Sequence, residues 1–164
     1  MSAAFVCRRL LFAVIACAAL IAAPALAQPI THAQPTLRIE TLKIVTHRGV
    51  FRFKVEIADT PRSEEIGMMF RPRLAPDKGM LFEQSATPQD ADYWMKNCPA
   101  SLDILFIKAD GTILTIARNT TPFSEAAILS GGPVTGVLEI RDGRAAEIGA
   151  APGDLVQHPF FHHG

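Results

Sequence analysis

The residues of this chain best suited to chemistry are Trp94, Lys96, Asn97 and Asp103, which follow one another within a short stretch that holds the only tryptophan. On a strand, Trp94 and Lys96 would share one face and Met95 would take the other. If Met95 faces the core, the indole is exposed beside a cation and an amide. Such a surface suits a sugar ring or another polar planar ligand. The structural alternative is a buried Trp94, with Lys96 paired to Asp103 and Asn97 bonded to a turn.

Asp103 lies near the start of an apolar run. Its carboxylate must therefore be paired or hydrogen-bonded, because otherwise its pKa would rise. Arg71 is a natural bidentate partner, and the pair would either latch the segment around Arg71 to the sheet or form half of an anion site. The predicted ligand-binding set is Arg71, Trp94, Lys96, Asn97 and Asp103. In this set Trp94 stacks, Lys96 and Arg71 contact anions or hydroxyls, and Asn97 and Asp103 accept or donate hydrogen bonds.

Catalytic arrangements have less support than this ligand-binding set, and no catalytic residue is assigned. Asp92, Asp103 and Glu139 could converge across strands as an acid–base pair, but their spacing does not require it. His32 and His47 are the only histidines between the leader and the final segment. No Gly-x-Ser-x-Gly elbow accompanies them, so a Ser-His-Asp hydrolase is not indicated.

Soft side chains raise the question of copper, because an exported protein can meet this metal. The candidates are Met68, Met69, Met80, Met95 and Cys98. Two adjacent methionines cannot both face one site on a regular element, so core packing is the favoured interpretation. His158, His162 and His163 could bind metal adventitiously, although a flexible tail is the simpler interpretation. We expect neither a metal site nor a cofactor.

The first 27 residues have the pattern of a cleaved Sec signal peptide. Arg8 and Arg9 precede an apolar run over 10–23, and Ala25-Leu26-Ala27 is a small-x-small cleavage site. This pattern predicts a periplasmic or secreted protein. An uncleaved anchor and lipidation at Cys17 are the alternatives.

Cleavage would leave about 137 residues, enough for one domain with a core of its own. Two of the 16 basic residues are in the leader, so the rest of the chain carries a net charge of about −2. No basic stripe is present, and we expect a monomer with no nucleic-acid partner and no membrane span after cleavage. Cys98 would be the one remaining cysteine, either buried as a small hydrophobe or paired with another molecule.

The pattern of apolar residues after position 36 predicts a mainly β domain. Alternation predicts a hairpin of strands over 37–44 and 51–57, and Asp110-Gly111 indicates a second hairpin between 102–108 and 112–118. Further strands are predicted over 79–82, 93–96, 134–140 and 155–157, with 119–133 irregular. Thr60 and Pro61 begin a short helix, and 144–148 is a second one.

No βαβ alternation is visible, which favours a compact antiparallel sandwich or barrel-like domain with two short helices. We place the domain at 36–158, after a flexible lead-in over 28–35 and before a tail over 159–164.

Several short blocks occur in an order that resembles the family called domain of unknown function 192. They are Gly67-Met68-Met69-Phe70-Arg71, Gly79-Met80-Leu81-Phe82, Trp94-Met95-Lys96-Asn97, Leu102-Asp103-Ile104-Leu105-Phe106-Ile107, Val137-Leu138-Glu139 and Pro152-Gly153-Asp154. The resemblance spans roughly 40–158. It implies a compact β-rich domain, often secreted or membrane-tethered in prokaryotes, and no particular activity. Many relatives have Thr in place of Cys98, which weakens the hypothesis of a cysteine nucleophile.

The sequence therefore favours an exported domain that binds a small or envelope-derived ligand, such as a glycan, without catalysis. The alternatives are a hydrolase with paired carboxylates, a copper-binding protein and a structural envelope protein.

Overall fold

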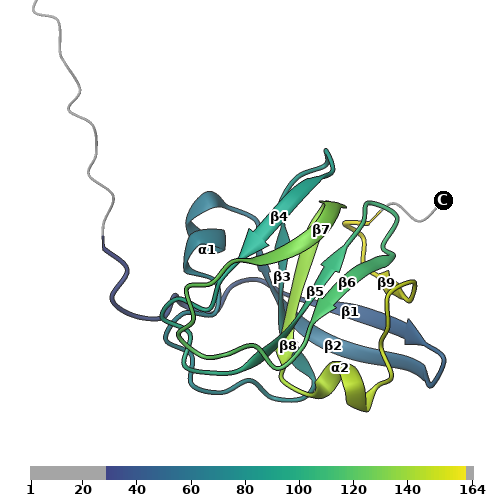
Figure 1. Ribbon diagram of the computed structural model, residues 1–164, viewed down its shortest axis with the longest axis horizontal. Coiled ribbons are helices and arrows are strands. Elements are labelled where there is room, and N and C mark those ends of the chain that lie inside the picture. The colour runs from purple at the N-terminus through teal and green to yellow at the C-terminus, as the bar shows by residue number, and fades with distance from the viewer. Residues whose placement is uncertain (1–28, 162–164) are drawn as a thin grey trace, which may run out of the picture.

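The computed structural model describes residues 29–161. The predicted signal peptide, His162 and His163 lie outside the described residues. Within the described range the chain forms nine strands and two short helices (Figure 1). The strands are β1 (Ile39–Thr46), β2 (Gly49–Ala58), β3 (Lys78–Glu83), β4 (Gln89–Tyr93), β5 (Leu102–Ile107), β6 (Ile113–Ala117), β7 (Ile128–Val134), β8 (Gly136–Arg141) and β9 (Leu155–Gln157). The helices are α1 (Pro61–Ile66) and α2 (Arg144–Glu147).

Seven strands form one sheet in the order β6-β5-β8-β3-β2-β1-β9, and β4 pairs with β7 in a separate ribbon. A bridge between Thr112 and Leu155 joins the two ends of the large sheet. Next to this bridge, the Val156 amide donates to the Gly111 carbonyl at 2.8 Å. The sheet is therefore nearly closed into a barrel. β2 and β3 pair in parallel, and the other strand pairs are antiparallel. The predicted mainly β, barrel-like class with two short helices is confirmed.

Alternating side chains explain why the sheet has two apolar faces. In β2, Phe53, Val55 and Ile57 are buried, whereas Arg52 and Lys54 are exposed. All seven strands of the large sheet contribute to one core cluster inside the barrel. The opposite faces of β3, β5 and β8 form a second cluster with residues of the β4–β7 ribbon and of the segments after α1 and β4. This second layer is where the candidate site lies.

Two element predictions are wrong. The strand predicted over 93–96 ends at Tyr93, and the residues that follow form a turn. The stretch 119–133, predicted to be irregular, contains most of β7. The apolar pattern of this strand is interrupted by Gly131, Gly132 and Pro133, so the sequence did not predict it. Pro133 is tolerated because β7 pairs with β4 alone.

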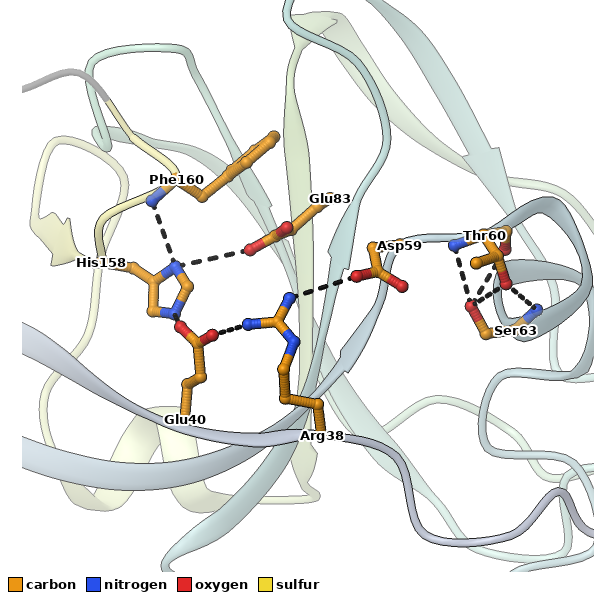
Figure 2. A network of polar contacts seen from close by, with 8 residues as sticks. All are labelled: Arg38, Glu40, Asp59, Thr60, Ser63, Glu83, His158 and Phe160. Carbon is orange, nitrogen blue, oxygen red and sulfur yellow. Dashed lines mark hydrogen bonds and ion pairs between the residues drawn. The ribbon is translucent and has the colours of Figure 1, made fainter.

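The segment after β9 packs into the domain as far as Phe161, which is 3% exposed. His158 is buried as well, and its Nε2 lies 2.9 Å from Glu40 Oε2 (Figure 2). Its Nδ1 accepts a hydrogen bond from the Phe160 amide at 3.3 Å. Burial, followed by the nearby charge of Arg38, lowers the pKa of His158, so the ring is neutral at pH 7. The flexible-tail interpretation does not hold for His158.

Between residues 29 and 161, no helix is both long enough and apolar enough to span a bilayer.

Candidate functional site

A cavity of about 360 Å³ lies beside α1 on the outer layer of the barrel. One wall is α1 with the turn that follows it, and the opposite wall is the end of β4 with the turn after it. The floor comes from the large sheet, through Phe82 of β3, Leu102 of β5 and Glu139 of β8. The volume falls within the range of small-molecule sites, which is roughly 300–1,000 Å³.

Local sequence fixes the α1 wall. The Ser63 amide donates to Thr60 Oγ1 at 3.1 Å, and the Thr60 amide donates to Ser63 Oγ at 3.0 Å (Figure 2). This capping box and Pro61 start the helix where Thr60 and Pro61 were predicted to start it. Gly67 ends the helix with φ 47°, and a Cβ there would lie 3.1 Å from the Phe82 ring. Glycine therefore allows the chain to turn tightly over the cavity floor.

Trp94 and Lys96 lie on the opposite wall, and both line the cavity. Trp94 is 48% exposed, and Lys96 Nζ lies 4.8 Å from the centre of the indole ring. Met95 is buried, so of the two alternatives left open by the sequence the structure has the exposed Trp94. A turn produces it, in which the Cys98 amide donates to the Met95 carbonyl at 3.0 Å.

Asn97 lies outside the cavity lining and connects its two walls. It adopts a left-handed conformation with φ 54°, which asparagine tolerates better than most residues. Its carbonyl accepts a hydrogen bond from the Phe70 amide at 2.7 Å, and its Nδ2 donates to Met69 Sδ at 3.7 Å. These contacts hold the turn after β4 against the turn after α1.

Arg71 does not pair with Asp103. Its guanidinium forms a bidentate pair with Glu56 of β2, with N–O distances of 2.5 and 2.9 Å. Burial by itself would raise the pKa of Glu56, but hydrogen bonds from Arg71 and from the Leu37 amide lower it overall. The predicted latch between the Arg71 segment and the sheet therefore exists with a different acid, and Arg71 lies outside the cavity lining.

Asp103 is fully buried on the other side of the sheet from the cavity. Its Oδ1 accepts from the Asn119 amide at 2.9 Å, and its Oδ2 accepts from the Ala145 amide at 2.8 Å. Ala145 is in the first turn of α2, whose N-cap is Gly143 and offers no side-chain acceptor. Asp103 therefore caps this helix from a distance. Of the five residues predicted to bind ligand, the structure brings Trp94 and Lys96 to the cavity and places Arg71, Asn97 and Asp103 elsewhere.

Glu139, which the sequence suggested only as one carboxyl of a hydrolase pair, lines the cavity. Its cross-strand partners are Met80 and Ile104, so the carboxyl lies in an apolar setting. The residue is 4% exposed, and its Oε2 has no hydrogen-bond partner within residues 29–161. Burial raises the pKa of Glu139 to about 8. At pH 7 the carboxyl is therefore mostly protonated, and it lies at the floor of a cavity that a small molecule could enter.

Two titratable neighbours share this environment. Burial, followed by the charges of Glu139 and Glu64, raises the pKa of Tyr93, whose hydroxyl accepts a hydrogen bond from Gln84 Nε2 at 3.0 Å. Burial and the charge of Glu139 raise the pKa of Cys98 to about 11. The buried thiol is therefore protonated, as expected for a structural cysteine, and is neither an activated nucleophile nor a thiolate ligand.

The methionines pack in the core, as the favoured interpretation predicted, because Met68, Met69, Met80 and Met95 are all buried. Met68 and Met69 both line the cavity together with Met95. Adjacent residues can do so here because Met68 and Met69 lie in a turn, not on a regular element. Met69 Sδ already accepts a hydrogen bond from Asn97. In the part of the chain that the structure describes, no group of three or more His, Cys, Asp and Glu residues could hold a metal ion.

Fold and site together define a small barrel-like β domain with an acidic, methionine-lined cavity on its outer layer. Comparison with known families matches residues 43–158 to DUF192, described as an uncharacterized ACR. The chain belongs to this family.

Two solved structures have the same fold. A Sinorhizobium meliloti 1021 protein, described as a candidate transcription regulator, is 38% identical, with a TM-score of 0.74 over 79% of this chain and 100% of that one. A Novosphingobium aromaticivorans DSM 12444 protein of unknown function is 36% identical, with a TM-score of 0.73 over 80% of this chain and 94% of that one. No curated protein matches the chain.

Proposed function

We propose that this domain binds a small organic molecule in the cavity beside α1 and does not transform it. The observation that carries the proposal is an exposed indole, Trp94, at the edge of a cavity whose floor holds an unpartnered carboxyl, Glu139. An exposed aromatic face offers stacking to a ring, and a buried polar group without a partner is costly unless a ligand satisfies it. The export signal predicted from the sequence favours a ligand from the cell envelope, such as a glycan fragment.

The proposal is tested by screening the full chain against a panel of neutral saccharides, organic amines and organic acids by calorimetry. A ligand of the cavity should bind saturably to the wild type and about fivefold more weakly to Trp94→Ala, since stacking contributes roughly 1 kcal/mol. Phe123→Ala is the matched control, because Phe123 is 63% exposed and does not line the cavity. Equal binding by both variants, or no binding by any member of the panel, would refute the proposal.

The raised pKa of Glu139 favours a second candidate, a hydrolase. A carboxyl that keeps its proton near pH 7 can act as a general acid, and Asp92 lines the same cavity as a possible second carboxylate. Asp103, an earlier candidate for this pair, is excluded because it is buried on two backbone amides. Chromogenic glycosides and esters provide the assay. Turnover should fall as the pH rises through about 8 and should disappear in Glu139→Gln.

A further inference from the structure

The floor of the cavity contains buried polar oxygens without a hydrogen-bond partner. Glu139 Oε2 and Gln84 Oε1 are both buried without a hydrogen-bond partner in the described part of the chain, and both residues line the cavity. A buried acceptor without a donor costs on the order of 1–3 kcal/mol. A ligand that presents N–H or O–H donors to this floor would recover that cost.

The ionisable side chains around the cavity are mostly acidic. Glu64 and Glu65 of α1 and Asp92 of β4 line it, whereas Lys96 is the one basic residue among the described lining residues. The Lys96 ammonium lies over the Trp94 ring. Burial, followed by the charge of Asp59, raises the pKa of Glu64. Glu65 is already paired with Arg62 at 2.9 Å. The remaining carboxyls around the cavity favour a cation over an anion.

The remaining walls suit the body of an organic cation. Trp94 and Tyr93 offer aromatic rings, and Met68, Met69 and Met95 offer polarisable thioethers. Aromatic faces attract ammonium groups, and flexible methionines adapt to apolar shapes. The cavity thus combines a buried, largely apolar interior that holds Glu139 with a more exposed rim that carries Glu65, Asp92 and Trp94.

We propose that the ligand of this cavity is an organic cation with a protonated amine and a short ring or alkyl body, and that its ammonium pairs with the Glu139 carboxyl. This inference rests on the proposed binding function and specifies its ligand class. A primary ammonium carries three N–H donors, enough for both unpartnered oxygens, Glu139 Oε2 and Gln84 Oε1.

Binding of such a cation releases a proton. Burial keeps Glu139 protonated below about pH 8, and an adjacent ammonium favours the ionised carboxylate. The neutral carboxyl therefore loses its proton to solvent as the ion pair forms. The titratable groups that face Glu139 are Tyr93 and Cys98, whose raised pKa values keep them neutral over this range, and Glu64 across the cavity, whose charge favours the same cation.

The test uses two probes of nearly equal shape, benzylamine and benzyl alcohol, with the full chain in a calorimeter. Titrations at pH 6, 7 and 8, each in two buffers of different ionisation enthalpy, give both the affinity and the number of protons released. Benzylamine should bind at least tenfold more tightly than benzyl alcohol. It should release about 0.9 proton at pH 7, the fraction of Glu139 that is protonated if its pKa is about 8. Its affinity should rise almost tenfold from pH 6 to pH 7 and by about fivefold from pH 7 to pH 8, since the ionised fraction of Glu139 rises by these factors if its pKa is about 8.

Glu139→Gln supplies the matched variant, because it keeps the shape of the side chain and removes its charge. It should bind benzylamine at least tenfold more weakly and show no pH dependence, while Glu125→Gln, an exposed site outside the cavity, should behave like the wild type. Proton release by the wild type tests the inference even if Glu139→Gln does not fold. Equal binding of the alcohol, or amine binding without proton release, would overturn the inference and leave the proposed function intact. Failure of both probes while a neutral saccharide or an organic acid of the panel binds would also overturn the inference alone. Failure of every compound would overturn both the inference and the proposed function.

Discussion

Replacing Glu139 with glutamine should stabilise the folded domain, and the gain should grow with pH. In the unfolded chain the carboxyl ionises with its ordinary pKa of 4.5, whereas burial raises the pKa to about 8 in the folded protein. A raised carboxyl pKa costs no stability below 4.5, costs progressively more between 4.5 and 8, and costs a constant amount above 8. Glutamine is neutral in both states and has no such dependence.

The magnitude follows from the pKa difference at about 1.4 kcal/mol per unit. The cost in the wild type is below about 1 kcal/mol at pH 5, about 3 kcal/mol at pH 7 and about 5 kcal/mol at pH 9. The amide of glutamine also lacks a partner at this site, but that penalty does not change with pH. The difference in the free energy of unfolding between variant and wild type should therefore rise by about 4 kcal/mol from pH 5 to pH 9.

Urea unfolding followed by circular dichroism at pH 5, 7 and 9 measures this difference for Glu139→Gln and for Glu125→Gln. The exposed control should track the wild type at every pH. A difference for Glu139→Gln that stays constant between pH 5 and 9 would refute the reasoning, because the folded carboxyl would then titrate as it does in the unfolded chain.

Three further substitutions separate structure from binding. Trp94→Ala should cost less than about 1 kcal/mol of stability, since the indole is half exposed, and thermal unfolding checks this. Asp103→Ala should cost about 3 kcal/mol because the buried Ala145 amide and the partly buried Asn119 amide lose their acceptor. Cavity binding should be unchanged at temperatures where the variant is folded. Arg71→Ala should cost about 2 kcal/mol at pH 7 by leaving Glu56 unpaired. The pKa of Glu56 is lowered in the folded wild type, so this cost should shrink as the pH falls below 4.5 and Glu56 gains its proton. Urea unfolding at pH 7 and at pH 3 measures the change.

Local patterns predicted much of the fold. Three features depend on neighbouring residues alone, and each occurs where it was predicted. They are the alternation in β2, the Asp110-Gly111 turn and the helix start at Thr60-Pro61. The sequence offered an outward Trp94 with an inward Met95 as one of two alternatives, and the strand assigned to them was wrong. β7 was missed because Gly131 and Gly132 interrupt its apolar pattern.

The site depended on information that no local pattern carries. Asp103 and Glu139 are both single acids in apolar strands, and nothing in their neighbours distinguishes them. Cross-strand register does so, because Ile104 lies opposite Glu139 whereas Asp103 lies opposite Ile140. The two acids therefore face opposite sides of the sheet, one toward α2 and the other toward the cavity.

The partner of Arg71 was hidden for a similar reason. Glu56 is on β2, whose solvent-facing side chains gave no reason to prefer it over Asp103. Burial of Glu56 under Arg71, with the Leu37 amide as a third contact, became visible only when the segment after α1 was placed against the sheet.

The most direct measurement is an NMR titration of the Glu139 side-chain carboxyl in protein labelled with ¹³C at glutamate, with Glu139→Gln to assign the signal. A neutral carboxyl at the cavity floor predicts a midpoint near pH 8. A midpoint near 4.5 would show that the carboxylate is solvated or already paired, and the cavity would lose the group on which its proposed chemistry depends.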